Sequence, residues 1–300
     1  MGAEESKEER WKQLLEEEMP DAVEKMTEKV SEDPEAYQKY LKLQAKHPRC
    51  TAISLLWLMD QHPEEQEFHT LQEWNNRGRY IIAGSEGTPL GWGMVRQEDG
   101  LTNDHIEWVF GSEQTYVSKR LRQKSPEQRL DGERLEAGVR TLLELSPVEV
   151  IIGPEGGAEE IRYDISSQQI LVPPGTDMEE TFRGLAREIL QAKVHQGMEG
   201  YERETFQMDA ESLSWMLCQR YGLPCPKPDL NGLAEQNIPW SLEERFECLG
   251  ALSQIYSQIE KEVTRNTGRE PISQRVEQAK AAITKASGKQ KTLEKAGKTR

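Results

Sequence analysis

Apolar residues recur every three or four positions over most of the first 75 residues, which is the spacing of one face of an α-helix. Proline and a capping residue mark the ends of these segments. Pro20 is expected to break the first helix, Pro34 to lie near the start of the second, and Thr51 to cap the third. Helices are therefore predicted over residues 4–30, 34–47 and 51–62, with a short one around 71–74.

From Arg79 the pattern changes to short β-branched and aromatic runs, which are typical of strands. Residues 80–83 and 91–95 flank the turn-rich stretch 84–89, so we interpret them as a hairpin. Residues 106–110 form a third strand candidate. Together with the preceding helices, these strands predict a unit of helices plus a small antiparallel sheet.

The second half of the chain alternates helical and strand patterns. Helices are expected over 130–145, 179–195, from an N-capping Asp209 to a terminating Gly222, and over 242–259; strands are expected over 148–152, 161–163 and 169–172. The basic segment 119–124 runs into Pro126, and we place a domain boundary there. The whole pattern predicts an α+β protein with two principal units.

Charge is distributed unevenly along the chain. The net charge is −15; residues 1–35 carry thirteen acidic and five basic residues, whereas residues 274–300 carry eight basic and two acidic ones. An acidic body does not favour tight binding to a phosphate backbone, so a nucleic-acid role must rest on local patches or on the basic tail.

The composition predicts a cytoplasmic protein. No apolar run approaches the roughly 18 residues that a membrane helix needs, and the acidic N-terminus lacks the pattern of a secretory signal. The four cysteines, at positions 50, 218, 225 and 248, form no C-x-x-C pair. We interpret them as reduced thiols, and no membrane contact is expected.

The helix predicted over 179–195 resembles a zinc-protease helix that has lost its metal ligands. In a zincin, the motif H-E-x-x-H places two histidines on one helix face to hold zinc, and the glutamate acts as general base. Here Arg187 and Gln191 stand at the two histidine positions, and Glu188 stands at the glutamate position. Arginine cannot bind a metal and an amide binds zinc poorly, so neither a metal nor another cofactor is expected.

Four ordered local matches make the chain resemble the ArdC-like antirestriction proteins and the related LtrC-like proteins of bacterial conjugative elements. They are residues 55–63 followed by 74–79, 109–115, 185–192, and 210–211 leading to 217–222, and the resemblance covers about 33–262. The family joins an N-terminal single-stranded-DNA-binding domain to a C-terminal zincin-like domain. The resemblance thus implies the zincin fold without its chemistry.

The resemblance also implies a division of the chain. It consists of an acidic N-terminal helix over 1–32, an ArdC N-terminal-like domain over 33–124, a degenerate zincin-like domain over 125–266 and a basic, helical or disordered tail over 267–300. Two departures accompany it. The family's Tyr-Ser-x-x-Asn pattern has no matching asparagine near Ser54, and the downstream acidic zinc ligand falls at Gln207 or Glu211.

Aromatic side chains beside cations suit single-strand binding, because bases stack on rings while cations follow the phosphates. Two such groups lie in the N-terminal half, whereas Trp57 and Trp108 are interpreted as core residues. The candidate contacts are Tyr37, Lys39, Tyr40, Lys42, Lys46 and Arg49 in the first group and Trp74, Arg77, Arg79, Tyr80 and Trp92 in the second. Residues 119–124 and the tail are alternative phosphate contacts.

The sequence patterns and the resemblance are compatible with three functions. The first is a non-catalytic protein of a conjugative transposon or plasmid that binds single-stranded DNA or its handling proteins, with a possible antirestriction role. The second is a zinc metalloprotease with an unusual ligand set formed by Glu188, His195 and Glu211. The third is an acidic decoy that mimics nucleic-acid charge and inhibits a host defence protein.

Overall fold

The computed structural model describes residues 13–91, 95–97, 100–102, 106–117, 129–153 and 159–268. Its helices are η1 (Leu14–Glu18), α2 (Met19–Glu32), α3 (Pro34–Lys46), α4 (Ala52–Gln61), α5 (Leu71–Asn76), η2 (Ser112–Gln114), α6 (Gly132–Leu145), α7 (Met178–Gly197), η3 (Arg203–Phe206), α8 (Gln207–Tyr221), α9 (Leu233–Asn237) and α10 (Leu242–Thr267). Its strands are β1 (Phe68–Thr70), β2 (Arg79–Ile81), β3 (Thr88–Gly91), β4 (Val95–Gln97), β5 (Gly100–Thr102), β6 (Ile106–Gly111), β7 (Thr115–Val117), β8 (Glu149–Ile152), β9 (Arg162–Asp164) and β10 (Gln169–Val172). The predicted α+β class is confirmed.

The N-terminal helices begin close to the predicted positions. Asp33 caps α3 by accepting a hydrogen bond from the Glu35 amide at 2.9 Å, and the Thr51 hydroxyl caps α4. The predicted break at Pro20 is wrong. Pro20 lies in the first turn of α2, where a missing N–H costs little, and the π-helical turn η1 continues into α2 without an interruption.

The predicted hairpin over residues 80–95 is also wrong, because β2 and β3 do not pair with each other. β2 pairs with β7, whereas β3 pairs with β6 in a sheet of order β1-β6-β3. The turn-rich connection is held instead by longer-range contacts. The Gln114 amide donates to the Glu86 carbonyl at 2.8 Å, and the Trp57 indole donates to the Pro89 carbonyl at 3.2 Å.

The C-terminal elements stack around α7. A mixed sheet of order β8-β10-β9 lies beside α7, with β8 parallel and β9 antiparallel to β10. α8 begins at Gln207, so Asp209 lies in its first turn rather than at the predicted N-cap. The helix ends as predicted at Gly222, which adopts φ +65°, a conformation that glycine reaches without strain.

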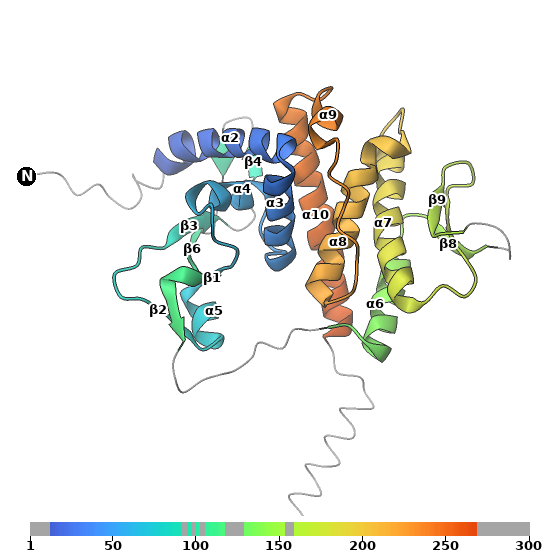
Figure 1. Cartoon of the computed structure of the whole chain (residues 1–300), viewed down its shortest axis with the longest axis horizontal. Coiled ribbons are helices and arrows are strands. Elements are labelled where there is room, and N and C mark those ends of the chain that lie inside the picture. Colours follow the sequence, from blue (N-terminus) through green and yellow to red (C-terminus); the bar gives the residue numbers. More distant parts are fainter. Residues whose placement is uncertain are drawn as a thin grey trace, which may run out of the picture.

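One hydrophobic core runs through the molecule from Leu14 to Val263. Figure 1 places α8 and α10 in the middle, with α2, α3 and α4 on one side and α6, α7 and the β8–β9 region on the other. Hydrogen bonds join the halves: the Tyr256 hydroxyl donates to the Ala45 carbonyl at 2.9 Å, and Ser253 Oγ donates to the Cys50 carbonyl at 3.3 Å.

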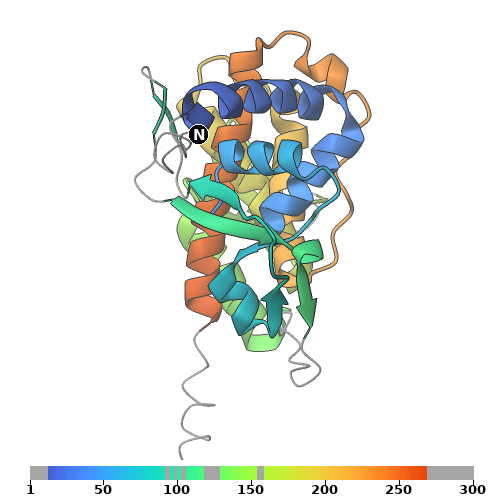
Figure 2. The same ribbon diagram turned by 90° about the vertical axis from the view of Figure 1, so that its left-hand side faces the viewer.

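The β1-β6-β3 sheet and the β2–β7 ribbon lie below α4, whereas the β4–β5 pair lies near α2 and contacts η1 (Figure 1). The view turned by 90° shows β3 and β6 crossing in front of the helices, with α5 and the β2–β7 ribbon beneath them (Figure 2). The predicted boundary at 124/125, the basic segment 119–124 and the tail from 269 lie outside the described residues. Within the described part, none of the helices has the length and apolar character required to cross a membrane.

Candidate functional site

The local sequence of α7 explains how its polar residues become buried. Asp177 caps the helix by accepting from the Glu180 amide at 2.8 Å, and an apolar face that includes Phe182 and Ile189 packs into the core. Glu188 and Gln191 lie within this packed surface and are both completely buried. Their polar atoms therefore need partners inside the protein.

The Glu188 carboxylate receives four hydrogen bonds. Arg203 binds it in a bidentate manner through Nη1 and Nη2, both at 2.8 Å, and Arg187 Nε donates at 2.7 Å. The backbone amide of Tyr163, in β9, donates at 2.7 Å. All the lone pairs of the carboxylate are thus engaged, which leaves no position for a water molecule that Glu188 would deprotonate.

Arg203 provides the cation that balances the buried Glu188 carboxylate. Burial by itself lowers the pKa of Arg203, but the hydrogen bonds and charge of Glu188 outweigh it, so the pKa is raised above the ordinary value. Arg187 is held separately by the Ile161 carbonyl, to which Nη2 donates at 2.7 Å. Two permanent cations therefore surround the glutamate where a zincin would have a metal-bound water.

Gln191, at the second histidine position, is part of a chain of hydrogen-bonded polar residues. Its Oε1 accepts from the Tyr201 hydroxyl at 2.7 Å, and its Nε2 donates to Gln207 Oε1 at 3.4 Å. Gln207 in turn donates to Glu211 at 2.7 Å, and the Glu211 carboxylate also accepts from the Asp229 amide. Gln207 and Glu211, the two candidates for the downstream zinc ligand, are thus hydrogen-bonded to each other.

His195 contacts the side chains of two tyrosines, Tyr163 and Tyr201. Its Nδ1 lies 2.7 Å from the Tyr163 hydroxyl, and its ring packs on Tyr201 with centroids 4.9 Å apart. Over the described ranges, which omit 118–128 and 154–158, the structure brings no three His, Cys, Asp or Glu side chains into a metal-binding group. An arginine and an amide at the histidine positions, with a second arginine on the glutamate, do not fit a zinc ion.

Three of the predicted DNA-contacting aromatics are buried, so their rings offer no face to a base. Tyr40 and Trp74 lie in the core, and the Trp74 indole donates to the Phe110 carbonyl at 2.8 Å. Tyr37 is buried between α3 and α8, where its hydroxyl donates to Ser212 Oγ at 3.4 Å and Asp209 Oδ1 at 3.5 Å. Helical periodicity placed these rings on a core face rather than on a binding surface.

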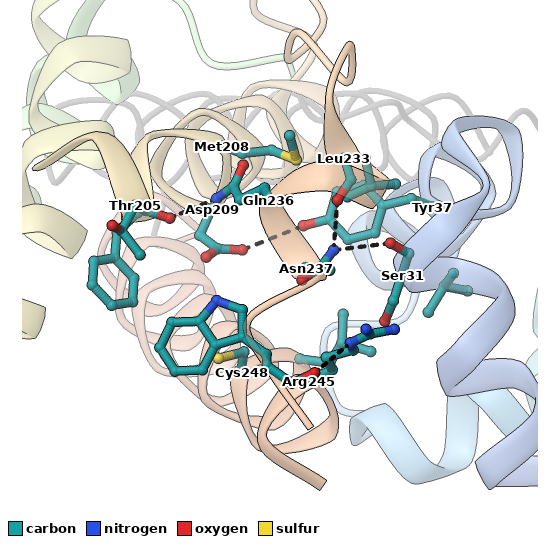
Figure 3. Close-up of a pocket in the computed structure, with 14 residues that line it drawn as sticks. Ser31, Tyr37, Thr205, Met208, Asp209, Leu233, Gln236, Asn237, Arg245 and Cys248 are labelled. Carbon is teal, nitrogen blue, oxygen red and sulfur yellow. Dashed lines mark hydrogen bonds between the residues drawn. The ribbon is translucent and has the colours of Figure 1, made fainter. Parts of the chain in front are cut away.

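Tyr37 and Asp209 meet at a cavity of about 40 Å³. Figure 3 shows the two side chains pointing toward each other, with Asn237 and Arg245 from the C-terminal segment nearby. Burial raises the pKa of Asp209 to about 6, although the hydrogen bond from Tyr37 lowers it. The cavity has room for little more than water, and Glu188 is not among the residues that line it.

The predicted bases are placed unequally. Lys39 and Lys42 are half-buried, and burial lowers the pKa of Lys39. Lys46 and Arg49 are exposed, and Arg77 and Arg79 are half-buried. The structure places Lys46, Arg49 and Arg77 around the carboxylates of Glu67 and Glu73.

Glu67 and Glu73 organise this group of bases, which we call the basic cluster (Lys46, Arg49, Arg77 and Arg79). Arg77 Nε lies 4.0 Å from Glu67, and Arg49 Nη2 lies 3.1 Å from Glu73. The pKa values of Glu67 and Glu73 are both lowered, and the hydrogen bonds from His69 are the largest cause. The charge of Lys46 contributes at Glu67, and the charge of Arg49 contributes at Glu73. Arg79 is held separately, because its guanidinium donates to Thr115 Oγ1 at 2.7 Å and to the Ser112 carbonyl at 2.8 Å.

A pair of aromatic rings lies on one face of the β2–β7 ribbon, whereas Arg79 of the basic cluster and its register partner Val117 lie on the opposite face. Tyr80 and Tyr116 are register partners with ring centroids 5.9 Å apart, and Tyr116 is 54% exposed. Arg79 precedes Tyr80 and stacks on Trp74 with its guanidinium 5.2 Å from the ring. Sequence reasoning included Tyr80 but missed Tyr116, because only strand pairing places it beside Tyr80.

Two tryptophans complete the placement of the aromatic residues. Trp57 is buried as predicted, whereas Trp108, expected in the core, is 53% exposed. It lies opposite Pro89 on the face of β6 that does not carry the buried Val109. Trp92 lies outside the described residues.

The fold and the site define an α+β protein with a central helix, α7, whose buried polar residues bind one another and their neighbours. Neither a protein-family profile nor a curated protein matches the chain. Two solved structures of the antirestriction protein ArdC from the R388 plasmid are similar to it. The metal-free form has a TM-score of 0.47 and 13% identity over 83% of this chain and 98% of that one; the Mn(II)-bound form has 0.43 and 14% over 74% and 85%. Likenesses of this size do not establish a shared function.

Proposed function

We propose that the chain is a non-catalytic, ArdC-like protein of a mobile genetic element, with an antirestriction role, that binds single-stranded DNA through its N-terminal half. The proposal rests on the ordered sequence matches to the ArdC-like family and on two features of this chain's own residues. The first is the occupied Glu188 carboxylate. The second is the Tyr80–Tyr116 ring pair on the β2–β7 ribbon, whose strand β2 also carries Arg79 of the basic cluster.

The saturated carboxylate supports the non-catalytic part. A general base must be within reach of the proton that it abstracts and must have a free lone pair for it. Glu188 instead accepts four short hydrogen bonds, two of them from one guanidinium. Its side chain is also fully buried, so a substrate would have to displace Arg203 to reach it.

The ring pair supports the DNA-binding part. Non-specific single-strand binding combines ring faces, on which bases stack, with cations that track the phosphates. Tyr80 and Tyr116 offer the rings, and the basic cluster provides cations from the end of α3, the α3–α4 connection, the end of α5 and β2. Because the body of the chain is acidic, binding to a phosphate backbone depends on a local group of bases such as this one.

Titration of a fluorescent single-stranded oligonucleotide at about 50 and 200 mM salt tests the DNA arm. We expect binding that weakens with salt and a loss of about 5–100-fold in affinity for Tyr116→Ala, since a stacked base is worth about 1–3 kcal/mol. Val117→Ala is the matched control, because Val117 is 51% exposed on the same strand with the opposite orientation. Equal losses for the two variants, or no binding at low salt, would sink the proposal.

Elemental analysis of the purified protein distinguishes the proposed non-catalytic protein from the zinc metalloprotease. The proposal expects no stoichiometric zinc, and His195→Ala should leave the metal content unchanged. About one zinc per chain, lost on His195→Ala, would instead support the ligand set of Glu188, His195 and Glu211.

A protein that binds no oligonucleotide but captures a host defence protein in a salt-sensitive manner would favour the acidic decoy.

A further inference from the structure

Cys218 and Cys225 are brought together where α8 ends. Gly222 reverses the chain in a left-handed conformation, and the Leu223 amide donates to the Cys218 carbonyl at 2.9 Å. This is the hydrogen bond of a Schellman motif, which folds the following residues back over the last turn of the helix. Cys225 consequently lies against α8, where its Sγ is 4.0 Å from Ser214 Oγ, one helical turn before Cys218, and the two thiols influence each other's pKa.

The chain around Cys225 is held in place on both sides. Pro224 and Pro226 flank it and restrict the backbone to few conformations. Arg183 Nη1, from α7, donates to the Pro224 carbonyl at 3.2 Å. Ser214 Oγ lies 4.0 Å from Cys225 Sγ and also donates to the Arg183 carbonyl at 2.9 Å. The position of Cys225 between α7 and α8 is thus fixed by several independent contacts.

The surroundings of Cys225 favour its thiolate. The neighbouring Cys218 thiol is the largest influence and outweighs burial; Ser214 and the positive charges of Arg183 and Arg187 add to it, so the pKa of Cys225 is lowered. The pKa of Cys218 is raised by its neighbour Cys225 and by burial. Cys225 is half-buried, whereas Cys218 is fully buried. A partly accessible thiol in positive surroundings beside a second thiol is the arrangement of a reactive and a resolving cysteine.

We propose that Cys225 and Cys218 form a peroxide-sensitive modification site. Cys225 attacks one oxygen of hydrogen peroxide as a thiolate, so that an S–O bond forms, the O–O bond breaks and hydroxide leaves. The resulting sulfenic acid reacts with the Cys218 thiol; an S–S bond forms, and the sulfenic oxygen leaves as water with the Cys218 proton. The disulfide ties the end of α8 to the Pro-Cys-Pro segment and removes a negative charge from beside Arg183 and Arg187.

The other two cysteines provide internal references. Cys50 is buried, and burial raises its pKa; Cys248, on α10, is half-buried, and burial raises its pKa to about 11. The charge of Arg49 acts on Cys50 but does not outweigh its burial, and the charges that act on Cys248 are those of acidic residues. Their thiols should remain reduced at peroxide concentrations that oxidise the pair.

The test uses the full chain, treated with hydrogen peroxide, denatured, alkylated with iodoacetamide and analysed by intact mass and peptide mapping. We expect two alkylated thiols, at Cys50 and Cys248, and a disulfide that removes two hydrogen atoms and maps to Cys218 and Cys225. Before peroxide treatment, Cys225 in the folded protein should be alkylated at least about tenfold faster than Cys248. Both measurements use the unaltered protein, so they do not depend on the folding of a variant.

Substitutions then assign the two roles. Cys218→Ser should abolish the disulfide and leave a sulfenic acid at Cys225 that dimedone traps, whereas Cys225→Ser should abolish both products. Cys248→Ser is the matched control and should behave as the unaltered chain. Four alkylatable thiols after peroxide, a disulfide at other positions, or alkylation of Cys248 as fast as Cys225 would overturn the proposal.

Discussion

Arg203 is the residue on which the buried Glu188 depends most. It supplies two of the four hydrogen bonds to the carboxylate, and its removal leaves a buried charge with less compensation. We expect Arg203→Met to lower the free energy of unfolding by about 2–4 kcal/mol, as measured by urea denaturation at neutral pH. Arg162→Met, on the exposed side of β9, should change it by less than about 0.5 kcal/mol.

A double substitution separates the ion pair from simple packing. Replacing both Glu188 and Arg203 by methionine removes the buried charge together with its partner, so the loss should be smaller than for Arg203→Met alone. A double variant that is as unstable as the sum of the two single variants would show that the carboxylate and the guanidinium do not act as a unit.

Asp209 gives the protein a dependence on pH at the residue scale. Burial raises its pKa in the folded protein to about 6, above the ordinary value, so the native state binds the proton more tightly than the unfolded chain. Its contribution to stability is therefore fully present below about pH 4 and is lost as the pH rises through 6. Asp209→Asn should be more stable than the unaltered chain by about 1–2 kcal/mol at pH 8 and equal to it below pH 4.

Urea midpoints at pH 4, 6 and 8 check this dependence. Asp21→Asn is the matched control, because Asp21 is an exposed acidic residue in the first turn of α2, just as Asp209 is in the first turn of α8. The control variant should lose only the small favourable interaction with the helix dipole. If both variants shift the midpoints alike at pH 8, burial of Asp209 is not the cause.

At the scale of elements, α7 is held against β9 through a close approach at Gly184. A Cβ atom added there would lie 2.6 Å from Ile161 Cδ1 and 2.8 Å from Ile161 Cβ. Gly184→Ala should therefore cost about 1–3 kcal/mol despite the better helix propensity of alanine. The displacement of β9 would also move the Tyr163 amide that binds Glu188.

Gly250 in α10 provides the opposite case within another helix. A Cβ atom at Gly250 meets nothing within 4 Å, so Gly250→Ala should raise the stability by about 0.5–1 kcal/mol. Thermal or urea unfolding of the two variants measures the difference. A Gly184→Ala protein that gains stability as Gly250→Ala does would contradict the close packing of α7 on β9.

At the scale of the whole molecule, the two halves share one core. Buried residues from α2, α3 and α4 belong to the same hydrophobic core as those of α8 and α10, and the hydrogen bonds of Tyr40 and Tyr256 cross the interface between them. We expect one cooperative thermal transition, with equal calorimetric and van't Hoff enthalpies. Two separable transitions would instead favour independent units divided near the predicted boundary.

The sequence by itself determined most of the helices and the chemistry of the central one. Helical spacing and local caps such as Thr51 are contained within a few neighbouring residues, so α3, α4, α7 and α10 could be predicted. Arg187 and Gln191 exclude the zincin histidines by residue type alone. The α+β class follows from the same local patterns.

Only the tertiary structure decided which partners these elements take. Strand pairing depends on residues distant in sequence, which explains why the hairpin prediction failed and why Tyr116 beside Tyr80 was missed. The burial of Tyr37, Tyr40 and Trp74 depends on which face meets a neighbouring element, and a helical stripe does not distinguish a core face from a binding face. Arg203, fifteen residues after Glu188, became the partner of that carboxylate only when η3 folded back onto α7.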